Sequence, residues 1–295
     1  MAAITIKSRG EKVFGVFNSF FMVLIAIVCL YPMLYILFAS LSEPDALLQH
    51  SGILVAPLGW NFAAYLRVAR NSAIGTGYLN TLFYVGIGTL TRMVMTILCA
   101  FVLTRKSFML SKPMNIMVVI TMFFNGGLIP TYLVVQWVGL LNNRWALIIP
   151  SVINVFNMII LRTNFNVFPG ELEDSARIDG ANEFQFLTRV LLPLSKAALA
   201  VITLYYAVSQ WNSWLPAVLY LRDRIRYPLQ LILREILLQN DMSVMQDGGD
   251  IAEDLAVAAT IKYATIIVST APILILYPFV QKYFVKGVMV GALKG

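Results

Sequence analysis

Polar side chains that could bind a substrate stand inside segments of the chain that are otherwise apolar. Amides can hydrogen-bond to sugar hydroxyls and aromatic faces can stack on sugar rings, so these residue types are compatible with a path for such a substrate. The candidates are Asn125, Asn154, Asn157, Tyr205, Gln210, Trp211 and Asn212. The alternative is that the same side chains make hydrogen bonds between helices and anchor the chain at the membrane interface.

One charge and one break also lie within apolar runs. Arg92 is near the middle of its run, where a charge costs about 2.5–3.5 kcal/mol on insertion scales, so it should face protein or water. An ion pair with another subunit and a gating role both remain open for it. Asn125, Gly126 and Gly127 interrupt another run, and such a break can line a transport path or serve packing.

The residues that catalysis or cofactor binding would need are absent from the sequence. No G-x-x-x-x-G-K-[ST] phosphate loop occurs, so no nucleotide is expected to bind in that way. No nucleophile–base pair, metal-ligand cluster or cofactor fingerprint is present, and Cys29 and Cys99 have no partner motif nearby. We therefore expect a protein that is not an enzyme, binds no cofactor and takes its energy from another polypeptide.

The elements that must position these residues are membrane spans. Hydrophobic residues make up 59% of the chain and charged residues 13%, which is far more apolar than a soluble domain. Each apolar run has the length that a bilayer demands, about 20 residues. The sequence predicts an all-α membrane protein with one transmembrane domain over residues 1–295. Its six expected spans are 13–39, 76–103, 113–135, 145–165, 194–218 and 256–280.

The basic residues indicate how these spans are oriented. The net charge of +7 comes from short clusters at the ends of apolar runs, which fits a lipid bilayer rather than a nucleic acid. Six spans place both termini on one side. The loops on that side carry 12 basic residues against 7 on the other, so both termini are expected in the cytoplasm.

Two loops between the spans have patterns of their own. The cytoplasmic segment 169–193 reads PGELEDSARIDGANEFQFLTRVLLP, with acidic residues early in a short helix, whose amino end favours negative charge. Gly180 should break that helix and Asn182 should cap the next one, which predicts a helix–turn–helix. In the outer loop 219–255, apolar residues at helical spacing after Pro228 predict a short amphipathic helix.

The segment 169–193 resembles the signature loop of permease subunits of binding-protein-dependent ABC importers, EAA-x3-G-x9-I-x-L-P. The matching residues are Asp174, Ser175, Ala176, Gly180, Val190, Leu192 and Pro193, with the spacing kept and with Asp for Glu, Ser for Ala and Val for Ile. FNGGLIPTYL at 124–133 and YFVKGVMVGALKG at 283–295 look like the carbohydrate-uptake branch. Within it the chain is similar to the maltose-type second permease, nearest to members for lipo-oligosaccharides or alginate fragments.

This resemblance implies partners and roles. The loop would be a coupling helix that docks on an ATPase, through Glu173, Asp174, Ser175, Ala176, Asp179, Gly180 and Pro193. The partners would be a second homologous permease, two ATPase subunits that hold ATP and magnesium, and an extracytoplasmic sugar-binding protein, in a bacterial plasma (inner) membrane. The implied function is import of an oligosaccharide, such as acidic alginate fragments. An ion-coupled secondary transporter and a membrane-embedded enzyme are the alternatives.

Overall fold

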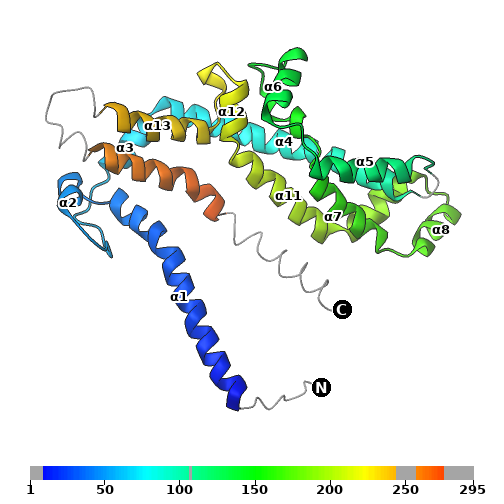
Figure 1. Ribbon diagram of the computed structural model, residues 1–295, viewed down its shortest axis with the longest axis horizontal. Helices are drawn as coiled ribbons and strands as arrows, with labels where there is room; N and C mark the ends of the chain where they lie inside the picture. Colours follow the sequence, from blue (N-terminus) through cyan, green and yellow to red (C-terminus); the bar gives the residue numbers. More distant parts are fainter. Residues whose placement is uncertain (1–8, 106–107, 244–256, 276–295) are drawn as a thin grey trace. The chain divides into compact units, whose positions relative to one another are not determined.

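The computed structural model describes residues 9–105, 108–243 and 257–275, and every regular element in these ranges is helical (Figure 1). This confirms the predicted all-α class. The chain forms two compact units. The first comprises Met1–Arg70 with Ile236–Val268, and the second comprises Asn71–Glu235 with Ser269–Gly295.

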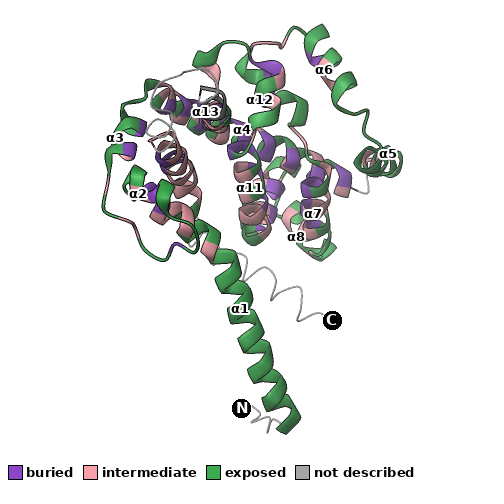
Figure 2. Ribbon diagram, turned by 60° about the vertical axis from the view of Figure 1, so that its left-hand side comes forward, coloured by how far each residue is buried: buried purple, intermediate pink, exposed green. Residues whose placement is uncertain are grey.

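The first unit contains a long helix whose apolar surface is uncovered. Helix α1 spans Arg9–Ser40, and no residue of its most apolar window is buried (Figure 2). Such a surface needs lipid or another protein against it. Two short helices follow, α2 (Pro44–Gln49) and α3 (Ala63–Arg70), and Leu47 of α2 packs in a small cluster with Ala39 and Leu54.

Three helices form the core of the second unit. They are α4 (Ser72–Thr104), α7 (Val155–Asn166) and α11 (Lys196–Trp211), which pack against one another. Their buried side chains, among them Phe101 and Leu161, make one apolar cluster. Asn71 caps the start of α4, because its side chain accepts a hydrogen bond from the Ala73 amide at 3.0 Å.

The break expected in the third span is present. Helix α5 (Ser111–Phe123) and helix α6 (Leu128–Trp137) meet at an angle of 117°. Gly127 lies between them with a φ of 88°, a conformation that side-chain-bearing residues rarely adopt. The side chain of Asn125 accepts a hydrogen bond from the Gly127 amide at 2.9 Å and so stabilises this turn.

Two further helix pairs are bent. The 3-10 turns η1 (Arg144–Leu147) and η2 (Ile149–Ser151) lead into α7 at 50°. The helical turns over Glu183–Leu194 meet α11 at 86°, just after Pro193. These turns are α9 (Glu183–Phe186), the π-helical turn η3 (Leu187–Leu191) and α10 (Leu192–Leu194).

Within the described ranges, three helices are long and apolar enough to cross a membrane, or six if each bent pair is one span. The three are α1, α4 and the helix Val257–Ile275. Each predicted span overlaps one of these six candidates. The end of the last predicted span, residues 276–280, lies outside the described residues.

The loop 219–255 also contains the helix that was expected after Pro228. Helix α12 (Trp214–Tyr220) and the turn η4 (Arg224–Arg226) lead to α13 (Leu229–Ser243). Leu229 and Ile232 of α13 are buried, and the Leu229 amide donates to the Thr81 hydroxyl of α4 at 2.8 Å. The rest of that loop, residues 244–255, lies outside the described residues.

Candidate functional site

The segment singled out in the sequence folds as a helix–turn–helix, as predicted. Helix α8 spans Gly170–Ile178, and Gly180 follows it with a φ of +79°. A Cβ atom at Gly180 would meet no other atom within 4 Å, so the backbone conformation alone calls for glycine. Asn182 begins α9 with a capping box, because its side chain accepts from the Gln185 amide and the Gln185 side chain accepts from the Asn182 amide.

The two sides of α8 differ in what they contact. Ala176 packs against the apolar cluster that α4 and α7 share. Ala176 is half-buried, so part of its small side chain is covered within this subunit. Asp174, Ser175 and Asp179 are exposed, and so is Ile178, an apolar side chain that is 86% accessible. Ile178 was not among the sequence candidates, although it is a large apolar residue in a charged segment.

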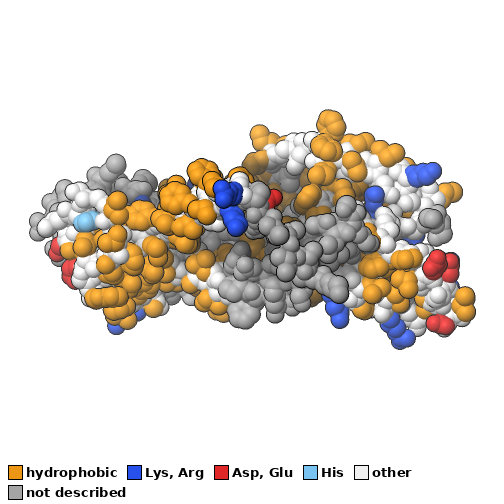
Figure 3. Space-filling model, turned by 90° about the horizontal axis from the view of Figure 1, so that it is seen from below, with side chains coloured by type: hydrophobic (Ala, Val, Ile, Leu, Met, Phe, Trp, Pro, Cys, Tyr) orange, Lys and Arg blue, Asp and Glu red, His pale blue; other side chains and the backbone are white. Residues whose placement is uncertain are grey.

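A charge network ties α8 to the end of α4. The Arg105 guanidinium lies 2.7 Å from the Glu173 carboxylate and 3.4 Å from that of Glu183. Arg177 contacts the same two carboxylates at 2.8 and 2.9 Å. Arg105 also lies over the rings of Phe101 and Phe186, at 4.1 and 5.2 Å from their centroids. Figure 3 shows charged side chains gathered at the end of the second unit where Figure 1 places α8.

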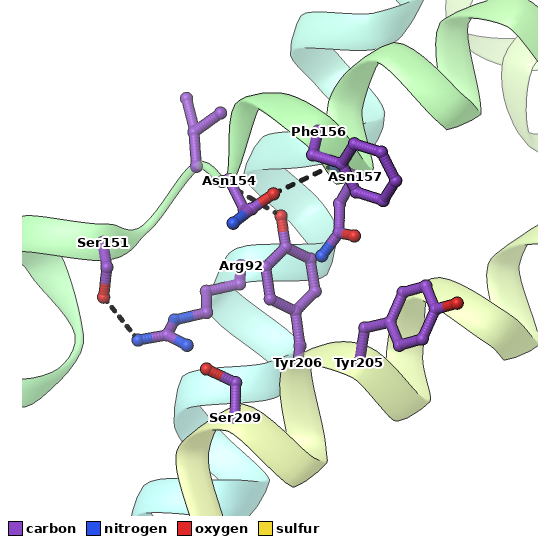
Figure 4. Close-up of a pocket in the computed structure, with 9 residues that line it drawn as sticks. Arg92, Ser151, Asn154, Phe156, Asn157, Tyr205, Tyr206 and Ser209 are labelled. Atoms are coloured by element: carbon purple, nitrogen blue, oxygen red, sulfur yellow. Dashed lines mark hydrogen bonds between the residues drawn. The ribbon is translucent and has the colours of Figure 1, made fainter. Parts of the chain in front are cut away.

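A second feature is an open polar cavity of about 330 Å³ between α4, the start of α7 and α11 (Figure 4). Three of the sequence candidates, Asn154, Asn157 and Tyr205, lie in its lining. The spacing of three residues predicts that Asn154 and Asn157 share one face of a helix, but Asn154 lies before the helix. It is the N-cap of α7, and its side chain accepts a hydrogen bond from the Asn157 amide at 3.0 Å. The backbone amide of Asn154 donates to the Tyr206 hydroxyl at 3.2 Å.

Arg92 also lines this cavity, its hydrogen-bond partners are neutral oxygen atoms, and its guanidinium lies 5.9 Å from the centroid of the Tyr206 ring. Its guanidinium donates to the Ser151 hydroxyl at 2.6 Å and to the Leu147 carbonyl at 3.3 Å. In Figure 4 the guanidinium lies between the side chains of Ser151 and Ser209. The sequence could not name these partners, because they come from a turn far away along the chain.

The remaining path candidates lie elsewhere. Gln210 is buried against Gly88 and donates to the Leu147 carbonyl at 3.3 Å, and Trp211 is buried beside Tyr78. Asn212 ends α11, where its side chain donates to the Val208 carbonyl at 3.0 Å. Gln210, Trp211, Asn212 and Asn125 are not part of the lining of this cavity, and the contacts given for them are with neighbouring helices or within their own turns. In the ranges that the structure describes, no group of three His, Cys, Asp or Glu side chains could hold a metal ion.

Apolar helices of membrane-spanning length, an open cavity lined by polar side chains and an exposed helix–turn–helix are features of a helical membrane transport protein. Residues 78–290 match the family described as the binding-protein-dependent transport system inner membrane component, and the chain belongs to that family. It is a multi-pass inner-membrane subunit of an ABC importer. This membership sets aside the alternatives of a secondary transporter and a membrane-embedded enzyme.

Several relatives resemble the chain over nearly its whole length. It is 39% identical to the polygalacturonan/rhamnogalacturonan transport system permease protein YtcP of Bacillus subtilis, over 97% of this chain and 99% of the relative. It is 36% identical to protein LplC of the same organism, over 98% and 97% of the two chains. A chain from the crystal structure of a bacterial ABC transporter that imports the acidic polysaccharide alginate is similar to it with a TM-score of 0.83 and 33% identity. That match covers 95% of this chain and 99% of the other.

Proposed function

We propose that this chain is half of the membrane pathway of an ATP-driven importer for oligosaccharides that carry carboxylates. The observation that carries the proposal is the similarity to two transport proteins whose named substrates, polygalacturonan and alginate, are both acidic polysaccharides. Its partners are a second permease, ATPase subunits that bind ATP and magnesium, and an extracytoplasmic sugar-binding protein.

The helix–turn–helix is the part of this subunit that contacts the ATPase. Asp174, Ser175, Ile178 and Asp179 form its exposed docking side. Glu173 and Ala176 act from the inner side, where they hold α8 to the rest of the subunit. A movement of the ATPase would therefore pass through α8 to α4 as one connected body.

Gly180 and Pro193 shape the chain around this docking side. Gly180 allows the turn between α8 and α9. Pro193 lies in α10, directly before the bend into α11. A displacement of α8 would thus reach α11, which carries Tyr205 of the cavity. This route connects ATPase closure to the substrate path.

The docking side must face the cytoplasm for this function, which agrees with the excess of basic residues on the loops of that side. The cavity lined by Asn154, Asn157 and Tyr205 then belongs to the path of the sugar. Amide groups would bind hydroxyls there, and the phenol ring would stack on a sugar ring. The candidates Asn125, Gln210, Trp211 and Asn212 are not included, because their side chains serve packing and turns.

Transport by the purified complex tests the proposal. The two permeases, the ATPase and the binding protein are reconstituted in liposomes, and uptake of radiolabelled trigalacturonate and of an alginate trisaccharide is measured with and without ATP inside. ATP-dependent uptake of at least one of these sugars is expected, with a neutral maltotriose as the control. Uptake of maltotriose alone would contradict the acidic substrate class.

A further inference from the structure

Arg92 is a buried positive charge for which the described part of the second unit supplies no carboxylate. Its side chain is 5% exposed, and its hydrogen bonds go to Ser151 and to the Leu147 carbonyl. Its Nε–H is buried and has no hydrogen-bond partner among the described residues. Arginine stays protonated in proteins, so this charge is permanent.

The sequence explains why no acidic group of the core helices reaches Arg92. No Asp or Glu occurs between Asp45 and Glu171, or between Glu183 and Asp223. These two stretches include α4, α7 and α11, and every residue that lines the cavity lies in them. Buried charges are normally paired, because a lone ion in a medium of low dielectric constant is costly. A carboxylate that meets Arg92 in the cavity must therefore come from outside these helices.

The other groups in the cavity are those that a sugar ring needs. Amides of Asn154 and Asn157 and the hydroxyl of Ser209 can bond to sugar hydroxyls, and Tyr205 offers an aromatic face. The volume of about 330 Å³ is at the small end for ligand sites, which begin at about 300 Å³. Hydroxyls, a flat apolar face and one carboxylate are together the features of a single uronate residue.

We propose that the guanidinium of Arg92 is the subsite for the carboxylate of one uronate residue as the sugar crosses the membrane. The inference rests on the proposed function and deepens it. The fork of the guanidinium matches two carboxylate oxygens, which neither Ser151 nor the Leu147 carbonyl can replace. These neutral oxygens accept hydrogen bonds from the guanidinium while the cavity is empty. Arg92 therefore keeps hydrogen-bond partners both before the sugar binds and after it dissociates.

The first test compares Arg92→Met and Arg92→Lys with the wild type in the reconstituted complex. Arg92→Met should lower trigalacturonate uptake by about tenfold or more, the loss expected for a hydrogen bond to a charged group. Co-purification of the ATPase with Arg92→Met should match the wild type, because the docking side of α8 lies away from the cavity. Arg92→Lys keeps the positive charge but lacks the two-pronged guanidinium, so its trigalacturonate uptake should lie between those of the wild type and Arg92→Met. Arg162→Gln removes a charge from α7 outside the cavity and should preserve uptake per ATP hydrolysed.

The second test reports on the cavity itself. In a chain with Cys29 and Cys99 replaced, Ser209→Cys places one thiol in the cavity lining. Trigalacturonate supplied during turnover should slow its reaction with a small maleimide, and the trimethyl ester, which has no carboxylate, should slow it less. Adding Arg92→Met should remove this difference.

Each alternative has its own result. If the wild type imports trigalacturonate and Arg92→Met imports it equally well, the subsite is refuted while the proposed function stands. If Arg92→Met no longer co-purifies with the second permease, Arg92 pairs with an acidic group of that subunit, and the subsite is again refuted. If the wild type imports no uronate trisaccharide, the proposed function fails and the subsite fails with it.

Discussion

The guanidinium of Arg105, directly after α4, lies 2.7 Å from the carboxylate of Glu173 in the first turn of α8. The Arg105 side chain is only 12% exposed, since it is covered by Phe101 and Phe186. An ion pair that is partly withdrawn from water is screened less by salt than a surface pair. This contact therefore joins the proposed ATPase-docking helix firmly to a core helix of the subunit.

Arg105→Gln should weaken that connection. The expected loss is about 1–2 kcal/mol of local stability, between the values of exposed and of fully buried pairs. Sugar uptake and ATPase stimulation should both fall, while membrane insertion is unchanged. Arg224→Gln is a matched control, because Arg224 pairs with Glu235 at 3.1 Å in the loop expected on the other side of the membrane. Equal effects of the two substitutions on coupling would contradict a special role for the Arg105–Glu173 pair.

Gly180→Val should impair coupling through the backbone. A φ of +79° costs a β-branched residue about 1 kcal/mol or more, so the turn between α8 and α9 would change shape. Gly180→Asn is the control, since asparagine tolerates this conformation and the space around the position is open. Uptake by the reconstituted complex should be low for valine and near wild type for asparagine. Similar uptake by both variants would exclude the turn as the cause.

Ile178→Asp should weaken binding of the ATPase by about tenfold or more, the range for an apolar residue central to an interface. The fold should be unaffected because the side chain is 86% exposed. Ile225→Asp provides the comparison, as Ile225 is also strongly exposed but belongs to the loop 219–255, which is expected on the other side of the membrane. Pull-down of the ATPase by detergent-solubilised permease measures the effect. Full retention by Ile178→Asp would place the docking surface elsewhere.

Ala176→Trp should reduce uptake because it disturbs packing inside this subunit. Ala176 lies against a buried cluster, and an indole there would push α8 away from the core at a cost of about 1–3 kcal/mol. Ser175→Trp, one position along on the exposed side, is the comparison. The thermal stability of the purified permease alone should fall for Ala176→Trp and stay constant for Ser175→Trp. An unchanged stability of Ala176→Trp would restore Ala176 to the docking surface.

The orientation of the chain can be measured with two single cysteines. Ser175→Cys lies on α8 and Ser72→Cys at the start of α4, and both serines are exposed. With Cys29 and Cys99 replaced, a membrane-impermeant maleimide should label position 72 in intact cells and position 175 only after permeabilisation. The opposite pattern would reverse the proposed topology.

Much of the local structure follows from signals that act within a few residues. Gly180 and Asn182 mark the end of one helix and the start of the next, since a positive φ and an N-cap hydrogen bond involve only neighbouring positions. Pro228 precedes α13 for the same kind of reason. The length of the apolar runs likewise predicts membrane-spanning helices, because bilayer thickness fixes how many residues they need.

The tertiary structure decided which faces of those helices meet. Asn154 and Gln210 are both amides beside apolar residues, and the sequence gives no reason to treat them differently. Only the packing of α4, α7 and α11 places Asn154 at the cavity and buries Gln210 against Gly88. Similarly, the hydrogen bond from Arg92 to Ser151 and the ion pair between Arg105 and Glu173 join residues that lie far apart in the sequence. Such contacts depend on how whole helices pack together, and that packing is a sum of many weak contacts that no short pattern records.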